Sequence, residues 1–506
     1  MLIFNLDITD FHHYNDPSDG GAQINPYIDR ILDGQVTHFL INTLSRGMRY
    51  GSGEVFPKGY DPEGPDDQPF LAPLGKIENI KSTRHLMDKV LDLHRQGIDY
   101  PARVIKRARE RGAAAWLSLR VNDVHNLDNE GHPIHSTFWR SNPHMRRKGY
   151  EGYFSKALDF GHKEVRADFQ AILVDQLEHY SPDGIELDFM REPYLFSRGE
   201  EAAGAEILNG WIREIHELVV KYAEKCGHDI QLGVRVPSRP EVSERFGIDA
   251  IKWAQEGLID LLVPTPRWAS LEFDIPIRKW RELLAGSSTA LAGGLEVLYQ
   301  PFRNASPHGV TAAQARGAAA QILASGADGV YLFNYFPSGG PTGEEVRWWT
   351  PREYPEILKT LGSLPDLKRH PRSYALTSHD VNAPDGNEVS SDSLPRKGAE
   401  IDLLLPTGPR PERDHPAELI LDIEIPVGTT VRPPAVCING SDALDFAYSR
   451  IANSGRSEYP IPGSYLHCVY ELSADGLKEV EENEIKIRSE DGLPILVLSL
   501  SINILS

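Results

Sequence analysis

The chain has 506 residues and a formal net charge of −20, with 53 Lys and Arg against 73 Asp and Glu. This length allows more than one domain and a large core, and 40% hydrophobic with 25% charged residues is ordinary for a soluble globular protein. So acidic a chain is a poor binder of nucleic acid or of an anionic membrane surface, because phosphate contacts need clustered cations. No apolar run reaches the roughly eighteen residues of a membrane-spanning helix, so we expect no membrane span.

The three cysteines, Cys226, Cys437 and Cys468, lack the spacing of metal ligands and cannot form a disulfide framework. At most Cys437 and Cys468 could pair, and free buried thiols are the better expectation. Met1 leads directly into an apolar strand pattern, without a basic segment followed by a long apolar one. We therefore expect either a cytoplasmic protein or one whose leader has been removed, and the sequence leaves the compartment open.

Strand and helix patterns alternate eight times between residues 2 and 361, which predicts a (β/α)8 TIM barrel. A doubly wound open sheet is the competing α/β fold, but no strand is followed by a G-x-G-x-x-G or Walker loop. The excursions at 45–80 and 122–161 are too long for ordinary connections, so we expect them to be functional. Strands are expected at 2–9, 37–43, 114–121, 185–189, 230–236, 258–264, 290–297 and 329–334, and helices at 26–32, 101–111, 164–180, 206–225, 249–256, 276–284, 312–324 and 351–361.

A second, smaller domain is expected after the barrel. A Pro-, Ser-, Asp- and Asn-rich stretch without periodicity is followed by short strands separated by turn signals such as Asn439-Gly440, which is typical of a small β-sandwich. We therefore divide the chain into a barrel domain (1–365), a linker (366–397) and a C-terminal β-sandwich (398–506). The sandwich strands are expected at 417–425, 436–438, 443–448, 465–472, 483–488 and 495–502.

The predicted fourth strand has one apolar face and one acidic face. Ile185, Leu187 and Phe189 alternate with two carboxylates, Glu186 and Asp188. A strand between two long helices is usually central in a parallel sheet and covered on both sides. Because an unpaired carboxylate is costly to bury, these two groups are expected to be paired or used in chemistry. A solvent-facing strand with surface carboxylates is the simpler alternative.

Active sites of TIM barrels lie at the C-terminal ends of the strands, where this sequence places a polar residue on every strand. Any one of them could be a solvated loop charge, but the recurrence at one end of the barrel favours a site. We expect two catalytic residues, Asp188 and Glu296. Substrate-binding residues are expected at Asp7, Asn42, Arg120, Asn122, Asp123, His125, Arg191, Glu192, Arg235, Arg239, Arg267, Trp268, Asn334 and Tyr335.

Paired carboxylates suit acid, base or nucleophilic work on a glycosidic bond. Asp188 and Glu296 come from the fourth and seventh strands, on opposite sides of the barrel mouth. Gly293 and Gly294 precede Glu296 and leave room for a ligand or an inward backbone. Two alternatives stay open: Glu296 could form a structural ion pair with an arginine, and Glu192 could replace Asp188 as the catalytic carboxylate.

We expect no metal and no cofactor. His12, His13 and His125, with Asp7 and Asp123, could in principle ligate a cation, but no H-x-H or H-E-x-x-H spacing occurs. No lysine stands at a strand end, which argues against Schiff-base chemistry. A phosphate site beside Gly293 and Gly294 has only weak support.

The segment 183–193 reads DGIELDFMREP and resembles the Asp-Gly-Ile-x-Leu-Asp-Tyr-Ile-Arg-Tyr-Pro motif of the glycoside-hydrolase-like family 10 proteins. The resemblance implies a (β/α)8 glycosidase over roughly residues 1–365, with Asp188 and Arg191 as the motif aspartate and arginine. It departs from the family at Glu192, where an aromatic residue is usual. Met190 occupies the position of the acid in chitinase-like barrels, so the substrate-assisted mechanism of those enzymes is not expected. The C-terminal sandwich is similar to accessory domains of polysaccharide-acting barrels, without a motif of its own.

These observations predict a glycoside hydrolase acting on a carbohydrate, a complex glycan. An anionic glycan, bearing uronic acid or sulfate groups, and a neutral one are both candidates. The case for a negatively charged substrate is a cluster of arginines at one rim of an otherwise acidic protein. Their guanidinium groups bind carboxylate or sulfate bidentately. A glycan-binding barrel with little activity and a metal-dependent lyase or isomerase are the alternatives. The arginines are Arg46, Arg49, Arg120, Arg191, Arg235, Arg239 and Arg267.

Overall fold

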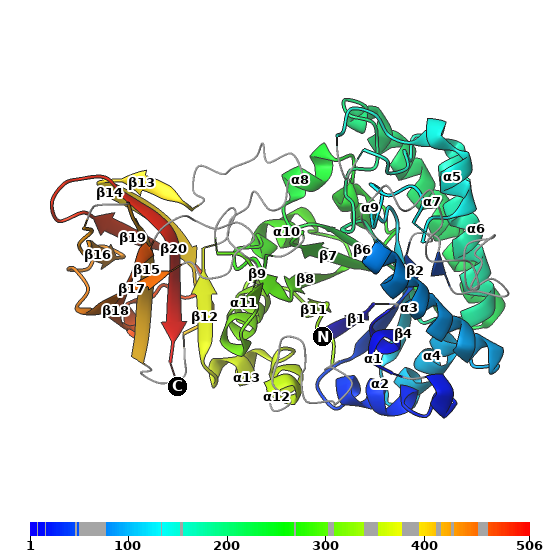
Figure 1. Cartoon of the computed structure of the whole chain (residues 1–506), viewed down its shortest axis with the longest axis horizontal. Helices are drawn as coiled ribbons and strands as arrows, with labels where there is room; N and C mark the ends of the chain where they lie inside the picture. Colours follow the sequence, from blue (N-terminus) through cyan, green and yellow to red (C-terminus); the bar gives the residue numbers. More distant parts are fainter. Residues whose placement is uncertain are drawn as a thin grey trace.

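The structure is a computed structural model with two lobes side by side, an α/β barrel and a smaller β lobe (Figure 1). It describes residues 1–7, 9–15, 17–45, 48–49, 77–132, 134–151, 155–267, 270–301, 308–337, 353–376, 394–410, 416–426, 430–453 and 464–505. The predicted site residue Trp268, like Arg46, lies outside this range, and the side chains of His13 and Arg49 are not described.

Eight parallel strands close into a barrel, which confirms the predicted fold. The order around the barrel is β1, β11, β8, β7, β6, β5, β4 and β2, and the ring closes because β1 also pairs with β2. A short strand, β3 (Met48–Arg49), extends β2 as an antiparallel edge. The barrel strands are β1 (Leu2–Leu6), β2 (His38–Ser45), β4 (Ala114–Arg120), β5 (Gly184–Asp188), β6 (Gln231–Pro237), β7 (Leu261–Thr265), β8 (Ala290–Glu296) and β11 (Gly329–Phe333).

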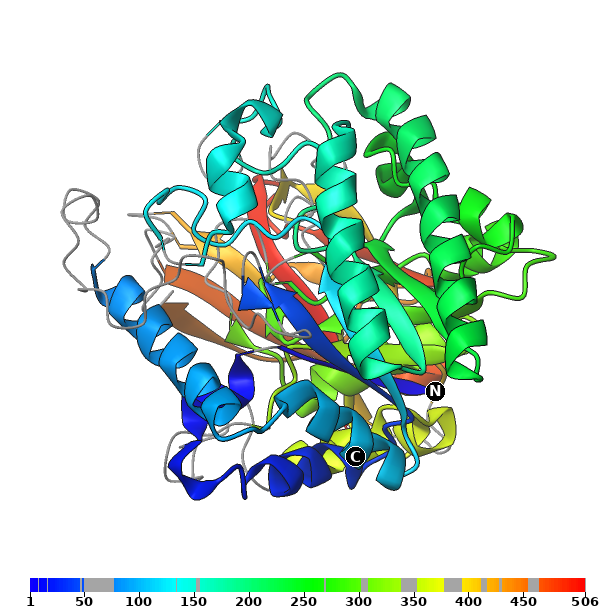
Figure 2. The same ribbon diagram turned by 90° about the vertical axis from the view of Figure 1, so that its right-hand side faces the viewer.

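Helices surround the barrel (Figure 2). Most follow a strand and cover it with an apolar face, as in α6, whose buried residues include Phe169, Leu173 and Leu177. The sequence analysis did not predict the long helix α3. The helices are α1 (Asp10–Tyr14), α2 (Ile24–Leu32), α3 (Ile77–Arg95), α4 (Tyr100–Glu110), α5 (Thr137–Ser141), α6 (Lys163–Tyr180), α7 (Glu201–Cys226), α8 (Pro240–Arg245), α9 (Ala250–Gln255), α10 (Ile277–Leu283), α11 (Ala312–Ala324), α12 (Glu353–Thr360) and α13 (Leu364–Lys368).

The N-terminal half of the barrel interior is filled by a small apolar cluster. Trp116 is its largest member, and its indole ring occupies the space beside Gly184, where a Cβ would lie only 2.3 Å from the ring. Glycine at position 184 is therefore required by the close approach of Trp116. Ile3, Leu40, Leu261, Val263, Ala292, Tyr331 and Phe333 complete this cluster, so the barrel is closed at this end.

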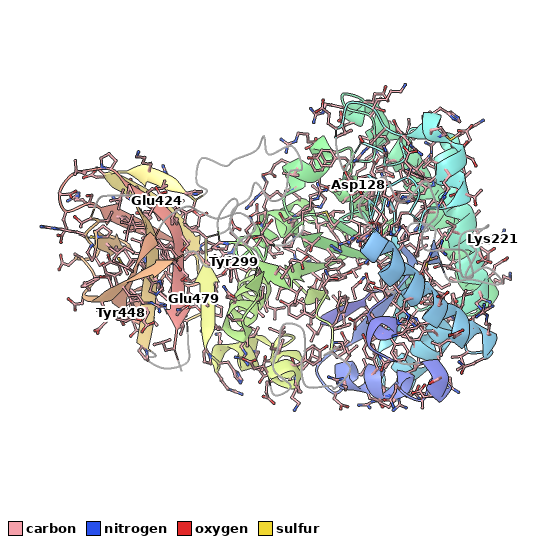
Figure 3. The ribbon with its side chains drawn as sticks, viewed as in Figure 1. Asp128, Lys221, Tyr299, Glu424, Tyr448 and Glu479 are labelled. Carbon is pink, nitrogen blue, oxygen red and sulfur yellow. The ribbon has the colours of Figure 1, made fainter. Side chains whose placement is uncertain are left out.

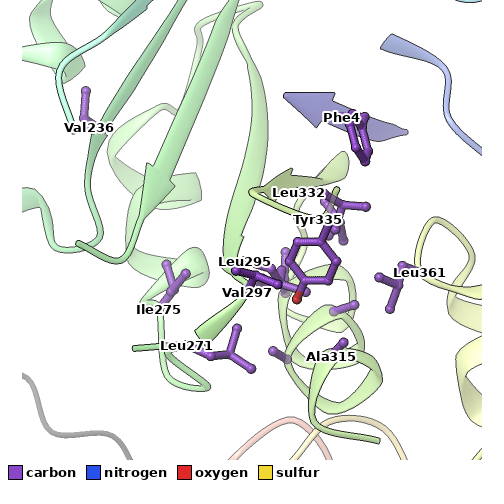
Figure 4. Packing of buried hydrophobic residues seen from close by; sticks show 14 of the residues in the cluster. Phe4, Val236, Leu271, Ile275, Leu295, Val297, Ala315, Leu332, Tyr335 and Leu361 are labelled. Carbon is purple, nitrogen blue, oxygen red and sulfur yellow. The ribbon is translucent and has the colours of Figure 1, made fainter. Parts of the chain in front are cut away.

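The larger core lies between the strands and the helices. Figure 4 shows part of it, where Leu295 and Val297 of the β8 region pack near Tyr335 and Ala315 of α11. Tyr335 is fully buried, and its hydroxyl donates to the main-chain oxygen of Glu296 at 3.4 Å. Tyr335 thus contacts the main chain of Glu296 from the helix-facing side of β8.

The C-terminal lobe consists of two antiparallel sheets, as expected for a β-sandwich. One sheet has the order β12, β20, β15, β18 and β17, with β13 also pairing to β20; the other has the order β14, β19 and β16. The described part of the chain includes β12 (Arg372–Ala375), β13 (Arg396–Gly398), β14 (Glu400–Pro406), β15 (Pro416–Ile425), β16 (Ala435–Ile438), β17 (Phe446–Asn453), β18 (Ser464–Ser473), β19 (Glu482–Arg488) and β20 (Ile495–Ile504).

The two lobes meet where α11 packs on β12. A Cβ on Gly317 of α11 would lie 2.0 Å from the main-chain oxygen of Ser373, so the helix and strand are in direct backbone contact. Tyr299, on the short strand β9 (Leu298–Tyr299), lies on the side of the barrel that faces the second lobe (Figure 3). The stretch predicted as a linker contains β12, which pairs with β20; the domain boundaries themselves remain a prediction.

All three cysteines are free thiols, and Cys468 is buried. Within the described part of the chain, no helix combines the length and apolarity needed to cross a membrane.

Candidate active site

The inward side chains at the C-terminal end of the barrel are polar. In a strand, alternate residues share a face, and register aligns Arg120, Asp188 and Arg235 on three neighbouring strands. Across the barrel, Glu296 of β8 is aligned with Phe333 of β11, a member of the interior cluster. Asp188 and Glu296 therefore both lie on the inward face of the barrel, near the ends of their strands.

Asp188 is a buried carboxylate held by two donors. Its side chain is 1% exposed; Oδ2 accepts from Nη1 of Arg235 at 3.2 Å, and Oδ1 accepts from the main-chain N–H of Met190 at 2.8 Å. The turn after β5 supplies the second donor, so the chain that carries Asp188 also fixes its orientation. The guanidinium of Arg235 lies 3.8 Å from the ring centre of Phe333, which holds this arginine flat beside the carboxylate.

Glu296 has a different environment. It is 5% exposed, and its Oε1 accepts from the main-chain N–H of Val297 at 2.9 Å. Burial raises the pKa of Glu296 to about 7, although the Val297 N–H, Arg235, Arg191 and the side chain of Asn334 lower it in part. At neutral pH this carboxyl group therefore exists as both acid and base.

A third carboxyl group, Glu186, lies one layer deeper than Asp188. Its Oε1 accepts from Asn5 at 3.1 Å, from Ser118 at 2.6 Å and from the hydroxyl of Tyr331 at 3.0 Å. Burial and the charge of Asp188 raise the pKa of Glu186 to about 7. Near neutral pH a substantial fraction of Glu186 is therefore protonated.

An ion-pair network runs along the rim beside Asp188. Arg120 contacts both Asp7 and Asp123, the second at 3.2 Å. Asp123 contacts Nδ1 of His125 at 2.5 Å, and Nε2 of His125 lies 2.6 Å from Nη2 of Arg191. Since arginine can only donate, Nε2 of His125 accepts and the ring proton lies on Nδ1, facing Asp123.

The rim network controls the charge of its members. Burial alone would raise the pKa of Asp7 and of Asp123, but Arg120 and Thr9 lower that of Asp7, while His125, Arg120 and Arg191 lower that of Asp123. Burial lowers the pKa of His125, which keeps its ring neutral near pH 7. These pairings hold the carboxylates ionised and the imidazole neutral at the entrance to the site.

Among the described residues, the buried polar atoms of the barrel interior that have no hydrogen-bond partner include Oε2 of Glu186, Nε of Arg235 and Oδ1 of Asn42. Asn42 uses its amide hydrogens on the main-chain oxygens of Leu44 and Ser118. Unpaired buried polar atoms are costly unless solvent or a ligand reaches them. A ligand with hydroxyl groups supplies both donors and acceptors for such atoms.

The comparisons with known proteins concern the fold. A scan against protein-family models finds no match, and a search of curated proteins finds none either. Among solved structures, the chain is similar to an Anoxybacillus alpha-amylase (12% identity, TM-score 0.38, covering 97% of this chain and 98% of the other). It is also similar to the PgaB (BpsB) glycoside hydrolase domain of Bordetella bronchiseptica (13% identity, TM-score 0.38, covering 72% of this chain and 98% of the other). A third similar structure is the chitinase ChiW of Paenibacillus (9% identity, TM-score 0.41, covering 99% of this chain and 56% of the other). Likeness at this level concerns the fold alone and carries no argument about function.

Glu192 lies in a separate buried cluster. Its carboxylate contacts Nη1 of Arg147 at 2.7 Å and Nη2 of Arg267 at 3.1 Å, and all three side chains are 3% exposed or less. Arg147 also donates to the main-chain oxygen of Tyr194. Glu192 thus ties the loop after β5 to its neighbours. The sequence analysis did not identify Arg147, because nothing local to the arginine indicates a partner 45 residues away.

Of the remaining predicted site residues, some lie beside the barrel mouth and others contact the residues that form it. Arg239 pairs with Asp274 at 2.9 Å, and Asn122 donates to the main-chain oxygen of Leu158 at 3.0 Å. Asn334 lies beside Glu296 with φ of 63°, a left-handed conformation that asparagine tolerates better than most residues. Tyr335 supports Glu296 from the helix side and does not face the barrel interior.

Gly293 and Gly294 serve packing; the sequence analysis had left open room for a ligand or an inward backbone. A Cβ on Gly294 would lie 2.1 Å from Oγ1 of Thr265, and one on Gly293 would lie 2.7 Å from Ile322 of α11. The space beside both glycines is therefore filled by protein. No group of three or more His, Cys, Asp or Glu side chains arranged to hold a metal ion occurs among the described residues.

Proposed function

We propose that this protein is a glycoside hydrolase in which Glu296 is the general acid and Asp188 is the partner carboxylate. The observation that carries the proposal is the contrast between these two inward carboxyl groups. Asp188 is paired with Arg235, whereas burial raises the pKa of Glu296 to about 7. Two carboxyl groups in opposed electrostatic environments are the arrangement that lets one donate a proton while the other stays ionised.

In this mechanism the protonated Glu296 gives its proton to the oxygen of the leaving sugar as the glycosidic bond breaks. Asp188 either attacks the anomeric carbon, which retains configuration, or activates a water molecule, which inverts it. Arg235 donates a hydrogen bond that orients Asp188, and the stacking on Phe333 restricts the arginine. In this proposal, the unpaired atoms of Asn42 and Arg235 bind sugar hydroxyl groups once the substrate has entered the barrel mouth.

The resemblance of segment 183–193 to glycoside-hydrolase-like family 10 proteins supports the same assignment, because it aligns Asp188 and Arg191 with the motif aspartate and arginine. Membership of that particular family is part of the proposal.

A complex glycan is the proposed substrate, and the described arginines bear on whether it is anionic or neutral. Four of the arginines counted in favour of an anionic glycan contact carboxylates of the protein, so pairing within the protein accounts for them: Arg120, Arg235, Arg239 and Arg267. An anionic substrate therefore has less support than the sequence indicated. If the substrate is anionic, activity should fall with added salt. A carboxyl-reduced or desulfated glycan should then be a poorer substrate than the charged form.

The test is release of reducing ends from a panel of glycans by the wild type, Glu296→Gln and Asp188→Asn. Glu241→Gln is the matched control, because Glu241 is an exposed carboxylate paired with Lys279. Both site variants should lose at least about 10²-fold in kcat/KM, as is typical of proton-transfer groups. On an aryl glycoside with an acidic leaving group, Glu296→Gln should recover much of its activity, because such a group leaves without protonation.

The two alternatives give different results in the same experiment. A glycan-binding barrel binds a panel member by calorimetry but releases no reducing ends, with or without the substitutions. A metal-dependent lyase or isomerase loses activity on treatment with a chelator, and Glu296→Gln then behaves no worse on unactivated than on activated substrates.

A further inference from the structure

Arg372 is a buried arginine far from the barrel mouth. It stands on β12 directly opposite Ile504 of β20, which in turn stands opposite Ala417 of β15. Residues directly opposite one another in antiparallel strands share a face of the sheet. Ile504 and Ala417 belong to the hydrophobic core and Arg372 is 1% exposed, so its guanidinium group is on the core side of the sandwich.

The guanidinium group lacks partners. Nε, Nη1 and Nη2 of Arg372 are all buried, and none has a hydrogen-bond acceptor among the described residues. Arginine does not lose its proton inside proteins, so the charge remains whatever the surroundings. An unpaired buried charge is among the most destabilising features of a fold, and buried charges are paired in nearly all proteins. A counter-charge at Arg372 is therefore required.

Further donors converge on the same place. Tyr374 lies two residues along β12 on the same face and is fully buried, and its O–H has no acceptor among the described residues. Burial raises the pKa of Tyr374, while Arg372 and the main-chain N–H of Gly408 lower it in part, so both groups lie close to the phenol oxygen. A Cβ on Gly408 would lie 2.6 Å from that oxygen, so only glycine lets this backbone approach.

We propose that Arg372, Tyr374 and the Gly408 amide form a buried binding site for a small monovalent anion, of the size of chloride. All three groups can donate hydrogen bonds, and the guanidinium supplies the positive charge. The site lies beside the contact of Gly317 with Ser373, where the barrel meets the sandwich. The bound anion therefore stabilises the junction between the two lobes. The proposal is independent of the glycosidase activity.

The experiment measures thermal unfolding of the full chain, dialysed into sodium gluconate and then titrated with sodium chloride at constant total sodium. Gluconate is too large for an enclosed site, so a rise in Tm that saturates with chloride reports a site-bound anion, whereas non-specific salt effects do not saturate. The wild type should show a saturable rise in Tm of about 2–4 °C with chloride. Sodium formate is a second arm, and a larger rise with formate identifies a carboxylate as the preferred ligand.

The variants are Arg372→Met and Tyr374→Phe, with Arg488→Met as the control. Arg488 is an exposed arginine of the same lobe, paired with Glu400. Arg372→Met should abolish the chloride effect and, because it removes an unpaired buried charge, should not lower Tm in gluconate; Tyr374→Phe should weaken the effect. Arg488→Met should keep the wild-type response.

Two outcomes overturn the proposal. One is a wild type whose Tm is the same in chloride, formate and gluconate. The other is an Arg372→Met variant that is strongly destabilised in gluconate, which would mean that a carboxylate of the chain is the partner of Arg372. If Arg372→Met does not fold, the salt titration of the wild type and of Tyr374→Phe decides the question by itself.

Discussion

Arg235 donates from Nη1 to Oδ2 of Asp188 at 3.2 Å, and both side chains are 2% exposed or less. The pair joins two neighbouring strands, β5 and β6, in the polar part of the barrel interior. A charge pair so well removed from water depends on both members, because either one alone would be a buried, uncompensated charge. Several consequences of this arrangement can be measured.

Arg235→Met should lower the free energy of unfolding by about 3–5 kcal/mol, because Asp188 is left buried without its partner. In the Asp188→Asn background the same substitution should cost much less, since no charge is stranded. Urea denaturation of the wild type, the two single variants and the double variant gives the coupling free energy between Arg235 and Asp188. Arg213→Met is the control: Arg213 pairs with Glu256 at the surface, where a salt bridge contributes about 0–1 kcal/mol. Equal losses in the two backgrounds would contradict the ion pair.

The activity should fall above about pH 7. The general acid must be protonated, and the pKa of Glu296 is raised to about 7, so its acid form disappears as the pH rises through that value. The alkaline limb of kcat/KM against pH should be absent for Glu296→Gln on an activated aryl glycoside. An unchanged limb in that variant would assign the acid to another residue.

Stability should also depend on pH through Glu186. Its pKa is raised from 4.5 to about 7 on folding, so between these values the folded state binds more protons than the unfolded state. The free energy of unfolding therefore falls as the pH rises through this window, and the loss is complete above the folded pKa. Glu186→Gln should unfold at a less pH-dependent temperature between pH 5 and 8 than the wild type. The raised pKa of Glu296 contributes in the same direction. The double variant Glu186→Gln/Glu296→Gln should therefore show the weakest dependence of Tm on pH.

Glu192→Gln should affect folding more than chemistry. The substitution removes the carboxylate that Arg147 and Arg267 share in a cluster that excludes water, and should cost about 3–5 kcal/mol. At a temperature where the variant is folded, kcat should stay within about tenfold of the wild type, whereas Asp188→Asn loses more. If Glu192→Gln abolishes turnover and Asp188→Asn is mild, the catalytic assignment is wrong.

Gly317→Ala should disturb the junction between the lobes. The new methyl group would overlap the main-chain oxygen of Ser373, so α11 and β12 must separate. Gly210→Ala is the matched control, since Gly210 also lies in a helix, α7, and a Cβ there meets nothing within 4 Å. Thermal unfolding should show a lower Tm for Gly317→Ala, and an unchanged or higher one for Gly210→Ala because alanine favours the helix by up to about 1 kcal/mol. Equal effects would mean that the junction tolerates the extra atom.

The sequence by itself determined the barrel. Each of the eight predicted strands overlaps an observed strand, because the alternation of inward and outward side chains is a property of neighbouring residues. For the same reason Asp188 and Glu296 could be placed on the inward face: each follows an apolar strand whose parity is visible in the chain. The strand β12 was missed, since it has four residues and pairs with β20 more than a hundred positions later.

Only the tertiary structure decided how the charges are used. Arg120 meets Asp7 from 113 residues away, and Glu192 meets Arg147 and Arg267 from different loops. The sequence analysis placed Arg120 and Arg267 in a cationic rim of seven arginines. Of the five rim arginines whose side chains are described, four contact protein carboxylates. The raised pKa of Glu296 likewise comes from burial by distant segments, which no local pattern encodes. Electrostatic energy depends on distance and on exclusion of water, and both are created when segments remote in the chain are packed together.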